Sequence, residues 1–413
     1  MRWRSAILFA ALAAIGGAKA DPDNYVIARR GRALAIAGDC VACHTAPGGA
    51  PLAGGLALAT PFGVIMTPNI TPDDASGIGR WTKVEFARAM HEGRGRNGAY
   101  LYPAFPYPYF TKVTREDTDA IFDYLKTLAP VTNAVNRRTL PFPFSVRALM
   151  IGWNSLFFKP GPFVPDPQHS PEFNRGAYLV EWLGHCGACH TPLNAFGANK
   201  ADQFLQGNRI DEWTAPDITN DQQSGLGKWS VDEVVQYLKN GQTRTTTASG
   251  PMRDVVEHST SKMPEADLRA IAVYLKERGA AGVPVPAAVP ASDPRMQVGE
   301  AIFVDTCSAC HTRNGAGIEH LFPRLADNAI VRQSDPTTLV RIVLTGVRGA
   351  GTDVFPTSPA MPSFGYRLDD DQVAAVVTYI RNSWGNTASP VDAELVKTLR
   401  SHVAGPVERS AAQ

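Results

Sequence analysis

All six cysteines of this 413-residue chain belong to three copies of one pentad, Cys-x-x-Cys-His. In this pattern each cysteine can form a thioether with a vinyl group of one haem, and the histidine that follows then lies beneath the ring with a nitrogen directed at the iron. A lone Cys-x-x-Cys would equally fit a redox dithiol or a zinc site. Three complete copies that leave no cysteine over instead predict three covalently bound haems c. The pentads are Cys40-Val41-Ala42-Cys43-His44, Cys186-Gly187-Ala188-Cys189-His190 and Cys307-Ser308-Ala309-Cys310-His311.

Each pentad assigns its residues to separate roles. The cysteines attach the haem, and the histidine supplies the first protein ligand to the iron. The predicted attachment residues are Cys40, Cys43, Cys186, Cys189, Cys307 and Cys310, and the predicted iron ligands are His44, His190 and His311.

The first 20 residues have the pattern of a secretory signal peptide. Arg2 and Arg4 precede a short apolar run at 6–15, and Ala18-Lys19-Ala20 provides the small residues of a cleavage site. The run is shorter than the ~20 apolar residues that a membrane-spanning helix needs. We therefore expect export to the periplasm. The net charge of +1 gives no indication of nucleic-acid binding.

A common frame surrounds the three pentads. A helix-like run with a glycine precedes each one (29–37, 174–183 and 298–304), and an amphipathic run with a tyrosine ends each repeat (115–128, 265–278 and 371–384). This resembles the class I cytochrome c fold, in which the first and last helices cross at a glycine and an aromatic residue. The paired residues are Gly31 with Tyr124, Gly176 with Tyr274, and Gly299 with Tyr379.

The chain is accordingly predicted to be mainly α-helical, with three tandem class I cytochrome c domains. Domains 1 and 2 look like a duplicated pair, because the block from Pro68 to Trp81 recurs from Pro216 to Trp229 at a constant offset. The expected division is signal peptide 1–20, domain 1 at 21–135, an apolar connecting segment at 136–170, domain 2 at 171–279, a Pro/Ala-rich linker at 280–294, domain 3 at 295–387 and a C-terminal tail at 388–413.

Methionine is the expected sixth iron ligand, since its sulfur favours ferrous iron and raises the haem potential. In domain 3, Met361 precedes the last helix, where this fold places its methionine. In domain 2, Met252 follows Gly250-Pro251, and Met263 at the start of the last helix is its competitor. We expect Met361 and Met252 to be the ligands.

Domain 1 departs from this pattern. Phe105 stands where Met252 stands in domain 2, and phenylalanine cannot bind iron. Either another side chain supplies the ligand or haem 1 has an open face, and we expect a substitute donor. Met66, Met90 and His91 are the available donors, and Met90 is a weak preference among them.

Further segments resemble one known family, the triple-haem cytochrome c subunits of bacterial membrane-bound dehydrogenases that oxidise alcohols, aldehydes, gluconate or fructose. The resembling segments include Thr60-Pro61-Phe62-Gly63, Leu101-Tyr102-Pro103-Ala104-Phe105-Pro106-Tyr107, Gly152-Trp153-Asn154 and Gly250-Pro251-Met252. The resemblance implies an electron-transfer subunit without substrate chemistry of its own. Its implied partners are a catalytic subunit of flavin, quinone or molybdenum type, ubiquinone or a terminal oxidase, and the periplasmic face of the inner membrane.

Two alternative functions and the roles of two segments remain open at this stage. A multihaem enzyme could use an open haem 1 to reduce peroxide or another small oxidant, and a soluble carrier would need no dedicated partner. Residues 146–163 are densely apolar, which fits either a docking surface or a strap packed between domains 1 and 2. The tail at 391–403 is expected to form a short amphipathic helix that contacts either a membrane surface or domain 3.

Overall fold

The computed structural model describes residues 22–136, 138–210, 212–280, 282 and 284–403. The predicted signal peptide lies outside these residues. Helices dominate the described chain and only three short two-stranded sheets accompany them, so the expectation of a mainly α-helical protein is confirmed. Among the described helices, none combines the length and apolar character needed to cross a bilayer.

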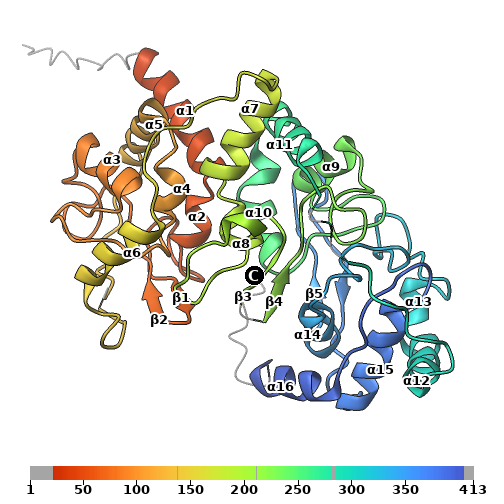
Figure 1. Cartoon of the computed structure of the whole chain (residues 1–413). Helices are drawn as coiled ribbons and strands as arrows, with labels where there is room; N and C mark the ends of the chain where they lie inside the picture. The colour runs from red at the N-terminus through yellow and green to blue at the C-terminus, as the bar shows by residue number, and fades with distance from the viewer. Residues whose placement is uncertain (1–21, 137, 211, 281, 283, 404–413) are drawn as a thin grey trace, which may run out of the picture.

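Three helix pairs organise the chain, and each encloses one pentad in sequence. The pairs lie side by side, with the pair of domain 2 between those of domains 1 and 3 (Figure 1). They are α1 (Pro22–Ala37) with α5 (Arg115–Lys126), α7 (Pro171–Ala177) with α11 (Glu265–Glu277), and α12 (Pro294–Ile302) with α15 (Asp370–Arg381).

The two helices of each pair cross at the predicted glycine and tyrosine. At each crossing a Cβ atom on the glycine would overlap a backbone carbonyl oxygen of the partner helix and crowd the Cβ of the tyrosine. Only glycine permits this approach, so the expected crossings are confirmed. The distances from such a Cβ are 1.9 Å to Ala120 O and 2.8 Å to Tyr124 Cβ for Gly31, 2.1 Å and 2.6 Å to Ala270 O and Tyr274 Cβ for Gly176, and 2.3 Å and 2.7 Å to Ala375 O and Tyr379 Cβ for Gly299.

The start of α5 (Arg115–Lys126) has only half of a capping box. The Thr114 side chain accepts the Asp117 backbone N–H, but the Asp117 carboxylate does not bond back to Thr114. It forms an ion pair with Arg30 at 2.6 Å and accepts the Tyr178 hydroxyl at 2.7 Å. Because Tyr178 belongs to domain 2, this carboxylate ties the two domains together instead of completing a local cap. In domain 3, Asp369 and Gln372 do form a full capping box.

The remaining elements connect the helix pairs. Two π-helical segments lead into the second and third pentads, η2 (Tyr178–Leu183) and η5 (Phe303–Cys307). The strands form antiparallel pairs: β1 (Ala57–Thr60) with β2 (Gly63–Met66), β3 (Asn208–Ile210) with β4 (Trp213–Ala215), and β5 (Val347–Arg348) with β6 (Ala360–Met361). The other segments are α2 (Cys40–Cys43), α3 (Lys83–Glu92), α4 (Tyr107–Phe110), η1 (Arg147–Leu149), α6 (Met150–Phe157), α8 (Gly187–His190), η3 (Ala201–Gln203), α9 (Val231–Asn240), α10 (Pro251–His258), η4 (Thr260–Lys262), α13 (Ser308–His311), α14 (Thr337–Thr345) and α16 (Ala393–Val403).

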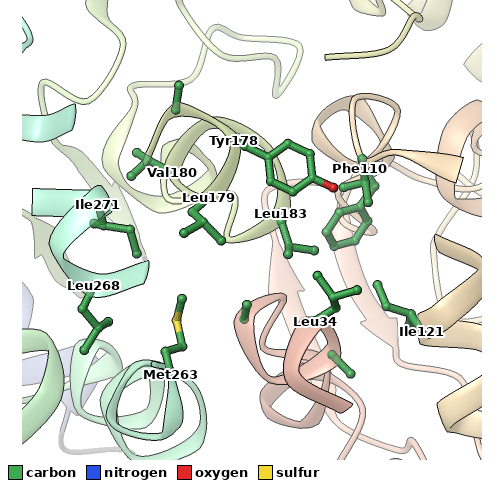
Figure 2. Packing of buried hydrophobic residues seen from close by; sticks show 14 of the residues in the cluster. Leu34, Phe110, Ile121, Tyr178, Leu179, Val180, Leu183, Met263, Leu268 and Ile271 are labelled. Atoms are coloured by element: carbon green, nitrogen blue, oxygen red, sulfur yellow. The ribbon is translucent and has the colours of Figure 1, made fainter. Parts of the chain in front are cut away.

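Domains 1 and 2 share one hydrophobic core, whereas domain 3 has its own. Figure 2 shows Leu34 of α1 and Leu183 of η2 close together at the junction, with Met263 and Leu268 on the domain 2 side. A continuous core holds the first two pentads in a fixed relation, because closely packed interiors resist relative movement.

The C-terminal helix α16 packs on domain 3. Val396 and Leu399 are buried against α14 and α15, and Arg400 forms an ion pair with Asp370 at 2.7 Å. The apolar face of the tail is therefore covered by its own chain, which is the second of the two roles expected for it.

Candidate haem sites

Each pentad histidine makes the same hydrogen bond. The Nδ1 atoms of His44 and His190 lie 2.7 Å from the carbonyl oxygens of Pro68 and Pro216, and Nδ1 of His311 lies 3.0 Å from that of Pro323. A carbonyl oxygen only accepts hydrogen bonds, so Nδ1 must carry the proton. Nε2 is then left with its lone pair, which is the form needed to bind iron.

A positive-φ glycine completes this arrangement in all three sites. The N–H groups of Gly54, Gly207 and Gly317 donate to the carbonyl oxygens of the respective pentad histidines at 2.7, 2.9 and 3.1 Å. A Cβ on Gly54 would lie 2.4 Å from the carbonyl carbon of Pro68, and one on Gly317 would lie 2.7 Å from the Pro323 oxygen. Only glycine allows the backbone of the proline to approach the histidine this closely. We call this three-part arrangement the histidine–proline clamp.

The ionisation of these groups fits haem attachment. Burial lowers the pKa of His44, His190 and His311 against the opposing effect of their hydrogen bonds, so the imidazoles are neutral. Burial also raises the pKa of the Cys40 and Cys186 thiols to about 12. A redox dithiol requires a lowered thiol pKa, so these cysteines do not fit that alternative. In the described part of the chain, no three His, Cys, Asp or Glu side chains gather as a metal site.

The first two pentads face each other across the interface between domains 1 and 2. Burial raises the pKa of the Cys43 thiol to about 11, with smaller contributions from Asp39 and from Cys189 of the other domain. Phe110 of α4 packs on the ring of His185, the residue before Cys186, at 5.4 Å. The cysteines predicted to attach haems 1 and 2 are thus close enough for one to affect the pKa of another.

Asp39 occupies the place in domain 1 that His185 occupies in domain 2. Both precede the first cysteine of a pentad, and both have positive φ angles, 46° and 38°. Burial raises the pKa of Asp39 to about 8, and Asp254 of α10 adds to this rise. One Asp39 oxygen is buried without a hydrogen-bond partner. This carboxyl group is therefore largely protonated near neutral pH.

The predicted sixth ligands differ in how protein covers them. An axial sulfur must present part of its surface to the haem, so protein atoms cannot enclose it completely. Met361 on β6 and Met252 on α10 are both half-buried. Met263 is 3% exposed and lies within the shared core. Figure 2 shows its side chain among Leu179, Leu268 and Ile271. These environments agree with Met252 over Met263, and both ligand assignments stay predictions.

None of the donors considered for haem 1 has surroundings like those of Met252. Met90 is 5% exposed, packed in the core on α3, so binding iron would require it to turn out of that core. His91 bonds to Thr118 Oγ1 through Nε2 at 2.9 Å. Met66 ends β2, where its backbone pairs with Ala57 of β1, and does not follow a Gly-Pro turn as Met252 does. Phe105 is half-buried beside Phe110, 5.6 Å between ring centroids.

The pentads identify the histidines but not the groups that orient them. Pro68 and Pro216 lie in the repeated block, so their recurrence was visible while their contact with His44 and His190 was not. The spacing from histidine to proline is 24, 26 and 12 residues in the three sites. No fixed spacing therefore links them in the sequence.

Comparisons with known proteins agree with this geometry. The sequence model of the cytochrome c family matches residues 28–129 and 296–384. The gluconate 2-dehydrogenase cytochrome c subunit of Pantoea cypripedii is 42% identical over 92% of this chain and 91% of its own length. The cytochrome c subunit of a quinone alcohol dehydrogenase of Gluconacetobacter polyoxogenes is 39% identical over 98% and 91%, and the fructose dehydrogenase cytochrome subunit of Gluconobacter japonicus is 38% identical over 90% and 82%.

Proposed function

Because the chain belongs to the cytochrome c family that includes the cytochrome subunits of gluconate, alcohol and fructose dehydrogenases, we propose that it is the electron-transfer subunit of a dehydrogenase complex. A catalytic partner of flavin, quinone or molybdenum type oxidises the substrate. Electrons then pass through three haems c to ubiquinone or a terminal oxidase. The observation that carries the proposal is the histidine–proline clamp at all three pentads.

The mature chain is expected to hold three covalent haems. Intact-mass measurement after acid-acetone extraction should retain three haem masses, since thioethers survive treatment that removes non-covalent haem. A variant with Cys307→Ala and Cys310→Ala should retain two. Two haems on the correctly matured parent chain would contradict the proposal.

The purified chain alone is expected not to oxidise alcohols, aldehydes or sugar acids, because hydride abstraction needs a cofactor other than these haems. Affinity purification from the native host should recover a dehydrogenase subunit, and the recovered complex should reduce the haems when its substrate is added. Substrate-dependent haem reduction by the isolated chain would contradict the proposal that a separate subunit oxidises the substrate.

We also place the mature protein on the periplasmic face of the inner membrane. Support comes from the signal-peptide pattern at 1–20 and from the segment at 140–164. This segment bonds to both flanking domains, through Trp153 Nε1 to the Phe196 carbonyl oxygen of domain 2 at 2.9 Å and the Phe163 N–H to the Lys112 carbonyl oxygen of domain 1 at 3.2 Å. It nevertheless leaves large apolar side chains exposed, which marks an interaction surface. These are Phe142, Phe144, Val146, Leu149, Ile151, Leu156 and Val164.

This apolar surface is expected to hold the chain on lipid. Phe142 is 84% and Leu156 is 73% exposed, so Phe142→Glu with Leu156→Glu should leave folding intact while weakening co-flotation with vesicles of phosphatidylethanolamine and phosphatidylglycerol. Val354→Glu, at an apolar site that is 61% exposed on domain 3, is the matched control and should float as the parent does. Equal flotation of all three chains would exclude this surface as the membrane contact.

A further inference from the structure

The two loops that carry Met252 and Met361 meet across the interface of domains 2 and 3. Ser249 forms an antiparallel bridge with Gly349, and the Ala350 N–H donates to the Ala248 carbonyl oxygen at 2.9 Å. Residues 347–350 begin with β5, the strand that pairs with β6, where Val347 stands opposite Met361. Residues 347–350 of domain 3 therefore contact the strand of Met361 on one side and the loop that precedes Met252 on the other.

The fit between these loops leaves no free space. A Cβ on Gly349 would lie 2.1 Å from Ser358 Oγ and 2.5 Å from Thr247 Cγ2, and so would overlap both loops. Ala248 and Ala350 are almost fully buried, and with Val256 they form a small cluster against which Met252 packs. A shift of one loop would therefore disturb the packing of the other.

Glu257 adds a charged link to this contact. Its carboxylate Oε1 accepts the N–H of Gly351 at 2.7 Å and that of Arg253 Nε at 2.8 Å. Although burial acts against them, these two hydrogen bonds lower the pKa of Glu257, so the carboxylate is charged. Glu257 lies on α10, the helix that carries Met252, and Gly351 lies in the loop that leads to Met361.

We infer that Glu257 is a positioning residue that joins the two methionine loops, so that the sixth ligands of haems 2 and 3 are held together and are released together. The inference rests on the proposed ligand roles of Met252 and Met361. A hydrogen bond to a charged group is stronger than a neutral one, and a partly buried carboxylate that loses its donor is costly. Moving the Gly351 loop away from α10 would therefore break the hydrogen bond from Gly351 to Glu257 and leave the carboxylate without that donor.

The test compares Glu257→Ala with Glu257→Gln in the full-length chain loaded with haem. Glutamine keeps an oxygen that accepts the Gly351 N–H but removes the charge, whereas alanine removes both. Carbon monoxide is added to the reduced protein, because it binds only where the sixth ligand leaves the iron. For Glu257→Ala we expect binding at haems 2 and 3 to become roughly tenfold faster, the factor expected for the loss of one charge-assisted hydrogen bond. Glu257→Gln, which keeps a neutral hydrogen bond to Gly351, should give a clearly smaller increase than Glu257→Ala.

The redox titration separates this effect from simple electrostatics. Removing a negative charge alone raises haem potentials, whereas loosening a methionine lowers them. Glu257→Gln should therefore raise the two waves slightly, and Glu257→Ala should lower both. Asp119→Ala is the matched control, because Asp119 forms an i,i+4 pair with Arg115 at the same 2.8 Å on a helix remote from both loops.

Three results would overturn the inference: an effect of Glu257→Ala on one haem only, equal behaviour of the alanine and glutamine variants, or a matching change in Asp119→Ala. A wrong ligand assignment gives a different pattern, since Met252→Ala or Met361→Ala would then leave its wave in place. Failure of the proposed partnership with a dehydrogenase would affect neither measurement.

Discussion

Replacing Met361 with alanine is expected to lower the reduction potential of one haem by on the order of 0.1–0.3 V. This shift is a fraction of the range over which axial ligands set haem potentials. Sulfur favours ferrous iron, so its loss stabilises the oxidised state. The backbone at this position should not move, because β6 pairs with β5 and Gly346 fits closely against the Met361 carbonyl oxygen. The shift would therefore report the lost ligand and not a displaced loop.

A buried methionine of the same domain gives the control. Met296 is 7% exposed on α12, so Met296→Ala should cost about 2–5 kcal/mol of unfolding free energy through the cavity it leaves, with no displaced redox wave. Met252→Ala should lower a second wave in the same way as Met361→Ala. An unchanged titration after Met252→Ala would move the assignment to Met263, and an unchanged titration after Met361→Ala would remove the domain 3 ligand.

The parts of the fold that the sequence predicted are those set by local chemistry. The pentads identify the haem-binding residues because covalent attachment requires these residues to be close together in the sequence. Gly31, Gly176 and Gly299 were recognisable because each precedes a pentad at a similar distance, and a tyrosine marks each partner helix. The start of α15 at Asp369 is likewise set locally, by a capping box that lies within four residues.

The parts that the sequence did not predict depend on residues far apart in the chain. The Asp117 carboxylate had a local role available at the α5 cap, but Arg30 and Tyr178 bind it instead, and no pattern near residue 117 indicates this. The pairing of Ser249 with Gly349 joins loops of two domains that share little sequence. The π-helical turns before the second and third pentads have no composition signal of their own.

Haem 1 is expected to differ from the other two in what covers its sixth position. Phe105 stands where the methionine stands in domain 2, and the side chain is apolar. The candidate donors have other surroundings: Met90 packs in the core, His91 bonds to Thr118, and Met66 ends β2, paired with Ala57. A donor that leaves the core must give up its packing, at a cost of the same order as a buried large-to-small substitution.

Carbon monoxide added to the reduced parent protein is therefore expected to bind quickly at one haem in three. Met90→Leu, which conserves the buried volume, should bind it in the same way. If Met90 is instead the ligand predicted from the sequence, the parent will resist carbon monoxide and Met90→Leu will bind it at one haem. Binding by the parent would also give the alternative function its first support, because an iron that admits carbon monoxide can admit peroxide. Steady-state oxidation of the reduced protein by peroxide, compared with a Phe105→Met variant that restores a sulfur ligand, then separates the two roles: turnover by the parent that Phe105→Met abolishes would identify an enzyme, and equally slow oxidation of both would leave electron transfer as the function of haem 1.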